Sequence, residues 1–104
     1  MEVIMPLTLD QAREHKRAYD KTYFYPQPYG DYTRGTGLVT LGEHIEELKK
    51  KGFNDENLPK TDGISLEDYC LVVTLRNEPP KNVHYPHCFG SLKIFYQIER
   101  GIGF

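Results

Sequence analysis

The sequence predicts an α+β fold: one small domain, spanning residues 1–104, with two helices and an antiparallel sheet. Two observations carry this prediction. A strongly capped amphipathic helix occupies residues 41–51, and two strand patterns occupy residues 69–75 and 92–99. A chain of 104 residues suits a single domain with one modest core.

The first predicted helix covers residues 9–20. Thr8 precedes it as an N-cap, and Gln11 stands three residues later, where it completes a capping box. The apolar face of this helix is thin. The helix instead holds the most basic stretch of the chain, formed by Arg13, His15, Lys16, Arg17 and Lys21. A helix this polar is typical of a protein surface or of a contact with a partner.

The second predicted helix covers residues 41–51 and is the clearest local pattern. Thr40 is its N-cap, and Glu43 closes a second capping box. One apolar stripe follows the spacing i, i+4 and i+7, formed by Leu41, Ile45 and Leu48. Gly52 stands after the last turn, where a residue in the left-handed conformation commonly ends a helix.

Two strands are predicted in the second half. Residues 69–75 are almost continuously apolar, which is typical of a strand covered on both faces. Residues 92–99 alternate between apolar and polar, which is typical of a strand with one buried face. We expect the two to pair antiparallel, because a parallel crossover usually contains a helix and the prolines of the connection oppose one. Residues 2–5 are a candidate third strand, with a disordered start as the equal alternative.

Charge and composition narrow the function classes. The net charge of −2 and the isoelectric point of about 6.1 argue against general binding to nucleic acid or acidic membranes. No apolar run has the length of a transmembrane helix, and residues 1–6 lack the pattern of a secretory signal. We therefore expect a cytoplasmic protein that does not enter a membrane. Its two cysteines, Cys70 and Cys88, are expected to be free thiols.

Tyrosine, proline and glycine dominate residues 23–37, which we expect to be irregular or extended. The tyrosines suit core cover, contact with a protein partner, or stacking on single-stranded nucleic acid, and core cover is favoured. The stretch Arg34-Gly35-Thr36-Gly37 lacks the spacing of phosphate-binding loops. We interpret its glycines as loop residues with positive φ.

Residues 84–88 hold the most suggestive chemical cluster: His84, His87 and Cys88. Imidazole and thiolate groups are preferred ligands of zinc, but a site would need at least one further ligand, such as Cys70, His44 or a carboxylate. Structural roles for these side chains are favoured. A zinc site, or a Cys–His pair used as nucleophile and base, is the alternative.

The strongest features are structural, so exclusion favours a small non-catalytic protein-binding module: a regulator, an inhibitor or an accessory subunit. Its candidate contact residues are Arg13, Lys16, Arg17, Tyr25, Tyr29, Tyr32 and Arg34. A small enzyme or sensor that uses the 84–88 cluster is the alternative, and single-stranded nucleic-acid binding by the tyrosine-rich segment is a second one. We also expect a homo-oligomer, because two strong strands alone are marginally stable.

Overall fold

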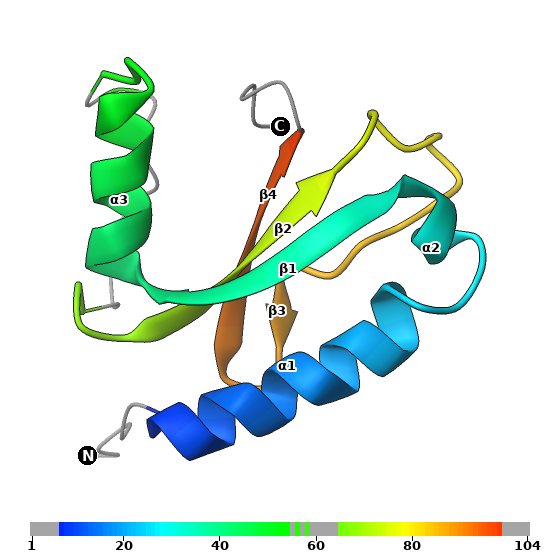
Figure 1. Ribbon diagram of the computed structural model, residues 1–104, viewed down its shortest axis with the longest axis horizontal. Helices are drawn as coiled ribbons and strands as arrows, with labels where there is room; N and C mark the ends of the chain where they lie inside the picture. Colours follow the sequence, from blue (N-terminus) through cyan, green and yellow to red (C-terminus); the bar gives the residue numbers. More distant parts are fainter. Residues whose placement is uncertain (1–6, 55, 57, 59–64, 99–104) are drawn as a thin grey trace.

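A computed structural model describes residues 7–54, 56, 58 and 65–98. The helices are α1 (Leu9–Tyr23), α2 (Tyr29–Tyr32) and α3 (Leu41–Lys50). The strands are β1 (Thr33–Thr40), β2 (Tyr69–Leu75), β3 (Cys88–Phe89) and β4 (Leu92–Ile98), which form one mixed sheet (Figure 1). The α+β class and both long helices are confirmed, whereas the candidate strand at residues 2–5 lies outside the described residues.

The four strands lie in the order β1-β2-β4-β3. β1 is antiparallel to β2, and β3 is antiparallel to β4. β2 and β4 are parallel, so that Cys70 lies opposite Lys93 and Leu75 opposite Ile98. The expected antiparallel pairing of these two strands is therefore wrong. The connection returns across the sheet as an irregular segment without a helix, and the short β3 then turns the chain into β4.

Hydrogen bonds and aromatic contacts hold this helix-free crossover in place. The hydroxyl of Tyr96 on β4 donates to the carbonyl oxygen of Pro86 in the crossover. The ring of Tyr85 lies 5.3 Å from the ring of Tyr96, measured between centroids. The amide of Ile94 donates to the carbonyl oxygen of His87 over 3.0 Å. The Tyr96 side chain and the Ile94 backbone of β4 thus anchor a connection whose own sequence favours no regular element.

The two long helices follow their capping signals. Thr8 and Gln11 form the expected capping box at the start of α1. The hydroxyl of Thr40 accepts a hydrogen bond of 3.2 Å from the amide of Glu43 at the start of α3. The expected second capping box is only half formed, because the Glu43 carboxylate accepts from the Thr40 hydroxyl and not from the Thr40 backbone amide. After α3, Gly52 has φ of +93°, which is the left-handed conformation expected there. α1 extends past residue 20 to Tyr23, whose ring packs 5.3 Å from that of Tyr19.

The core lies between α1 and one face of the sheet. Because strand side chains alternate between faces, β2 and β4 each contribute every second residue to it. Its buried members are Ala12, Tyr19, Leu71, Val73, Leu75, Leu92, Ile94 and Tyr96. β2 was expected to be covered on both faces, and this holds only in part: Leu71, Val73 and Leu75 are buried against the core, whereas on the other face Cys70 is buried but Val72 and Thr74 are only half-buried.

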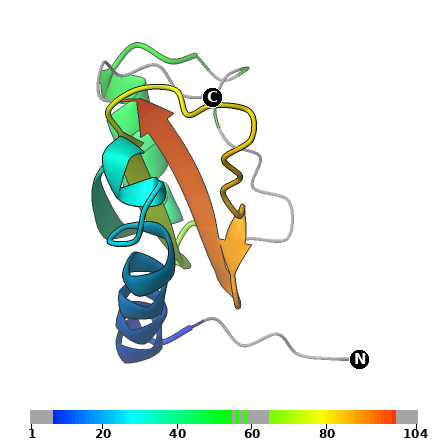
Figure 2. The same ribbon diagram turned by 90° about the vertical axis from the view of Figure 1, so that its right-hand side faces the viewer.

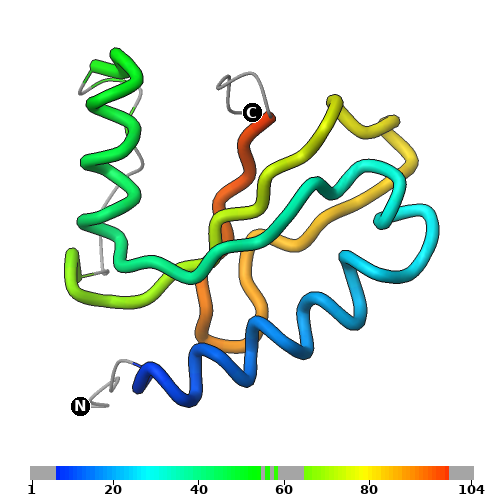
Figure 3. The backbone as a smooth tube through the Cα atoms, in the orientation of Figure 1, coloured from blue at the N-terminus to red at the C-terminus, as the bar shows by residue number. Residues whose placement is uncertain are grey.

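The helices cover the two faces of the sheet unequally. α1 packs along one face, while α3 stands against one end of the other face (Figures 1 and 2). The trace in Figure 3 shows α1 and β1 running side by side in opposite directions, joined through α2. None of the described helices has the length and apolar character needed to cross a membrane.

β1 begins within the segment 23–37, which we expected to be irregular or extended, and its first five residues take the extended alternative. Gly35 and Gly37 are strand residues, and among the described glycines only Gly52 and Gly90 have positive φ. The interpretation of the two β1 glycines as loop residues with positive φ is therefore wrong. Glycine weakens a strand locally, but pairing with β2 along the full length of β1 compensates for it.

Candidate functional site

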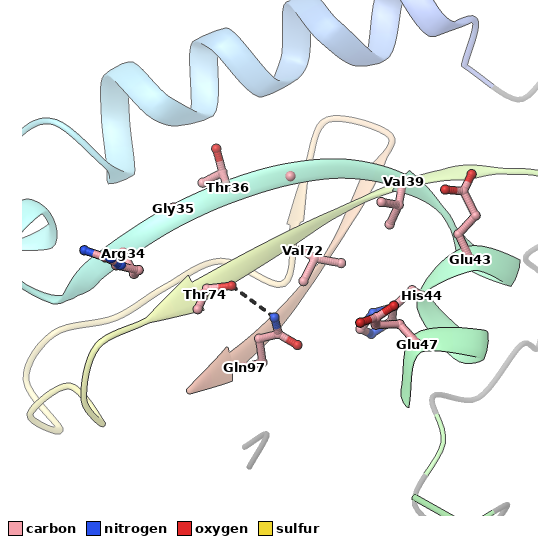
Figure 4. Close-up of a pocket in the computed structure, with 11 residues that line it drawn as sticks. Arg34, Gly35, Thr36, Val39, Glu43, His44, Glu47, Val72, Thr74 and Gln97 are labelled. Atoms are coloured by element: carbon pink, nitrogen blue, oxygen red, sulfur yellow. Dashed lines mark hydrogen bonds between the residues drawn. The ribbon is translucent and has the colours of Figure 1, made fainter. Parts of the chain in front are cut away.

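An open cleft lies on the sheet face opposite α1. Its floor comes from the second row of strand side chains, and α3 forms one wall (Figure 4). The cleft has a volume of about 470 Å³. Its floor includes Gly35 and Gly37 of β1, Val72 and Thr74 of β2, and Gln97 of β4. The cleft exists because α3 covers only one end of this face.

The two glycines leave this part of the sheet bare. A Cβ atom built on Gly35 or on Gly37 would meet no atom of the described part of the chain within 4 Å, apart from its own chain neighbours. Beside them, the side-chain amide of Gln97 donates a hydrogen bond of 3.0 Å to the hydroxyl of Thr74 (Figure 4). The floor is therefore shallow and mixed in polarity.

His44 of α3 borders the cleft but is itself only 6% exposed. Its ring stacks on that of Phe95 at 4.9 Å between centroids and 26° between planes. Burial lowers the pKa of His44, and the charge of Lys51 lowers it further. His44 was expected only as a possible further ligand for a zinc site at residues 84–88, but among the described residues no such group of ligands is placed together. Its position three residues after Leu41 places it instead on the apolar stripe of α3.

The outer edge of β1 is a row of backbone groups that no described strand pairs. The amide of Leu41 donates a hydrogen bond to the carbonyl oxygen of Asp68. With the register of the two strands, this bond shows which residues of β1 direct their backbone groups toward β2 and which direct them outward. Because hydrogen-bonded residues alternate along an antiparallel strand, the backbone groups of Gly37 and Val39 point toward β2. Those of Thr36 and Leu38 point outward, and the described residues offer them no hydrogen-bond partner.

The outward edge of β1 is flanked by α1. The hydroxyl of Thr36 donates a hydrogen bond of 2.7 Å to Oδ1 of Asp20, and the ammonium of Lys16 lies 2.9 Å from Oδ2. Arg13 lies two helical turns before Asp20 and Arg17 lies one turn before it, so both share its side of α1. Both arginines are exposed, and within the described part of the chain neither has an ion-pair partner.

We define the β1 edge surface as the outward backbone of Thr36 and Leu38 together with the exposed side chains of Arg13 and Arg17. Arg34, at the start of β1, lies on the opposite side of the strand and lines the cleft (Figure 4). Of the four basic residues predicted to contact a partner, Arg13, Lys16 and Arg17 therefore lie on one side of α1. Arg34 lies on the opposite face of the sheet, at the cleft.

The tyrosines predicted to contact a partner have different environments. Tyr29 packs against Tyr23 and Tyr85 with ring centroids 5.0 and 5.1 Å away. Tyr32 is half-buried in α2. Tyr25 is 68% exposed and stacks on Phe24. Tyr29 thus belongs to an aromatic cluster beside the core, and Tyr25 is the most accessible of the three.

A short chain of tyrosine hydroxyls runs through the core. The Tyr96 hydroxyl donates to the Pro86 carbonyl oxygen, so the Tyr19 hydroxyl is the donor in the 3.2 Å bond between the two tyrosines. Burial raises the pKa of Tyr19 and of Tyr96 well above the ordinary value. These hydroxyls stay protonated at neutral pH and act as structural hydrogen-bonding groups.

The cluster at residues 84–88 lies at the β3 edge of the molecule. His84, His87 and Cys88 are all exposed, and the His87 ring lies edge-on to Tyr96 at 6.2 Å. Within the described residues, no group of three His, Cys, Asp or Glu side chains is placed to hold a metal ion. Zinc binding by these three residues stays an untested prediction.

The two cysteines differ sharply in accessibility. Both are free, but Cys70 is buried in β2 whereas Cys88 is exposed in β3. Burial raises the pKa of the Cys70 thiol to about 12, with a smaller contribution from the charge of Glu43. A thiol with this pKa is protonated at neutral pH and is a poor nucleophile.

Comparison with known proteins identifies no relative: no protein-family model, no curated protein and no solved structure matches this chain.

Proposed function

We propose that this protein is a small non-catalytic protein-binding module, acting as a regulator, an inhibitor or an accessory subunit, and that it contacts its partner through the β1 edge surface. The observation that supports this function is the outward backbone of Thr36 and Leu38 beside the exposed Arg13 and Arg17. An exposed strand edge is a template for pairing with another chain, so natural proteins usually protect it.

The placement of the titratable groups supports a non-catalytic role. The described groups whose pKa burial shifts furthest are Tyr19, Tyr96 and Cys70, and none of them lines the cleft. His44 does line it, but its ring stacks on that of Phe95 and the residue is buried. General acid–base catalysis requires a group within hydrogen-bonding reach of a bound substrate.

The proposal is tested by affinity capture from an extract of the native cells. The bait is compared with the double variant Arg13→Gln and Arg17→Gln, which removes both cations and keeps good helix formers. The matched control is Lys49→Gln with Lys50→Gln, which removes two exposed cations from α3, away from β1. The proposal requires a protein captured by the parent and the control and lost from the α1 variant.

Two results would contradict the proposal. One is capture that the α1 variant retains in full, which would exclude the β1 edge surface. The other is capture of single-stranded nucleic acid alone, released by nuclease and by salt, which would favour the tyrosine-rich segment instead.

Self-association and location are separate expectations. The structure removes one reason for a homo-oligomer, because the chain itself places β1 and β4 beside the apolar β2. Light scattering across a concentration series tests the oligomer, and a mass of one chain throughout would exclude it.

We also propose a cytoplasmic location, which the two free thiols of Cys70 and Cys88 support because thiols persist in reducing compartments.

A further inference from the structure

We infer that the partner is an extended, acidic segment of another protein that adds to the sheet as a new strand along the outward edge of β1. This inference rests on the proposed function and specifies the chemistry of the partner. Peptides commonly bind in this way at exposed sheet edges, where main-chain hydrogen bonds supply affinity and alternate side chains supply specificity.

The backbone of β1 sets how such a strand would lie. Thr36 and Leu38 each direct an amide and a carbonyl group outward, so an added strand gains a regular ladder of hydrogen bonds there. Side chains of the added strand alternate between the two faces of the sheet. One row therefore lies on the α1 side of β1, and the other lies over the cleft.

The side chains of the added strand on the α1 side lie near the positive charges of α1. Arg13 and Arg17 lie on the part of α1 that faces this edge, while the nearby carboxylate of Asp20 is already bonded to Lys16 and Thr36. Glu14 lies one residue after Arg13 and therefore points about 100° further around the helix, away from β1. Acidic side chains in this row complement the arginines.

The side chains of the added strand that lie over the cleft have open space above the glycines of β1 and apolar surface beside it. Gly35 and Gly37 project no side chain, and among the described residues no atom beyond their chain neighbours lies within 4 Å of a Cβ built on either. A side chain of the added strand can lean across the glycines toward Val72 on the neighbouring strand. Apolar side chains with a preference for strands suit this row, and cross-strand contacts over glycine stabilise such edges.

A second copy of the chain suits the edge less well. If two copies paired antiparallel through β1, both α1 helices would lie on the same face of the joined sheet. The Arg13 and Arg17 side chains of the two copies would then approach one another, and like charges placed together across strands are destabilising. The pairing would also set glycine against glycine or valine in the cleft row, with little side-chain contact.

The test uses a labelled nonapeptide of alternating Glu and Val, titrated into the full chain at low salt. Fluorescence anisotropy measures its affinity, and amide NMR shifts locate it. We expect binding with shifts at Thr36 and Leu38, and no binding of the matched peptide of alternating Lys and Val. Adding salt should weaken the binding.

Backbone methylation of the peptide tests strand addition directly. One peptide carries N-methyl groups on its Glu residues and the other on its Val residues. Because alternate residues of an added strand face β1, only one of the two sets should abolish binding. Equal effects of the two sets would overturn strand addition, since they would mean that the peptide uses no ladder.

The α1 charges are tested in the same titration. The Arg13→Gln and Arg17→Gln double variant should bind about tenfold more weakly, as expected for the loss of two exposed ion pairs. The Lys49→Gln and Lys50→Gln control should match the parent. Equal affinity of parent and α1 variant, or shifts confined to β4, would overturn the inference.

The result also separates this inference from the proposed function. Cell-extract capture detects a protein partner of any chemistry, whereas the peptide tests only an acidic strand. Capture that depends on Arg13 and Arg17 together with a failed Glu/Val peptide overturns the inference and leaves the protein-binding function standing. Failure of both overturns both.

Discussion

The hydroxyl of Thr36 on β1 donates a hydrogen bond of 2.7 Å to the carboxylate of Asp20 on α1. Asp20 is 5% exposed, and Lys16 bonds its second carboxylate oxygen at 2.9 Å. This contact joins the helix to the strand edge across sixteen residues of sequence. It therefore determines which side of α1 lies beside β1 and places Arg13 and Arg17 along that edge.

Replacing Thr36 by Val should destabilise the protein by about 2 kcal/mol, because the hydrogen bond that is lost goes to a buried charged group. Urea unfolding measures the change in the free energy of unfolding. Thr22→Val is the matched control, since the Thr22 hydroxyl bonds only to the carbonyl of Ala18 on the exposed side of the same helix. An equal loss in the two variants would mean that the Asp20 contact adds nothing.

His44 should make stability depend on pH in the mildly acidic range. Its folded pKa is lowered by burial and by Lys51, while the unfolded imidazole keeps a pKa of about 6.5. The unfolded state therefore takes up the proton first. This contribution to stability is complete above pH 6.5 and is lost as the pH falls toward the lowered folded pKa, by at most about 1.4 kcal/mol per pH unit.

The variant His44→Phe isolates this contribution, because it keeps a ring against Phe95 and removes the titration. Urea unfolding at several pH values between 7.5 and 5 should show the variant gaining stability relative to the parent as the pH falls. His84→Gln removes an exposed imidazole and should retain the slope of the parent. Parallel pH curves for the parent and His44→Phe would refute the prediction.

The two thiols should react very differently in the native protein. Iodoacetamide at pH 7.5 should label the exposed Cys88 and spare Cys70, which is buried and whose pKa is raised to about 12. Mass spectrometry of digested protein counts the labels at each site. In urea both should react, and Cys88→Ser should remove labelling of the folded state. Rapid native labelling of Cys70 would contradict its burial in β2.

Tyr96→Phe should loosen the crossover between β2 and β4. The variant removes the donor to the Pro86 carbonyl and leaves the buried Tyr19 hydroxyl without that acceptor, at a cost of about 1–3 kcal/mol. Hydrogen exchange at the Ile94 amide, which bonds to the His87 carbonyl, should accelerate. Tyr25→Phe, at a largely exposed tyrosine, is the control and should behave as the parent.

Local interactions account for the parts of the fold that were predicted correctly. The capping residues Thr8 and Thr40 act within their own first turns, and Gly52 acts within its own last turn. The alternation of apolar and polar residues along Leu92–Ile98 arises because one face of β4 is buried against the core. Each of these signals depends on neighbours a few residues away, so the sequence alone contains it.

β1 was left open between an irregular and an extended segment, and the parallel pairing of β2 with β4 was missed, because both depend on distant residues. Gly35 and Gly37 have no strand preference of their own, and β1 exists because β2, more than thirty residues later, supplies its hydrogen bonds. The parallel order follows from Tyr96 and Tyr85 holding an irregular crossover in place. A pattern of neighbouring residues therefore predicts neither the β1–β2 pairing nor the anchoring of the crossover.

The sequence by itself determined the α+β class, the two long helices and their caps, and the basic character of α1. Only the tertiary structure decided that the basic side of α1 lies beside the outward edge of β1. It also decided that an open cleft lies on the opposite face of the sheet. The physical reason is that the capping and alternation signals act within a few residues, whereas the Thr36–Asp20 contact and the β1–β2 ladder join residues far apart in the chain.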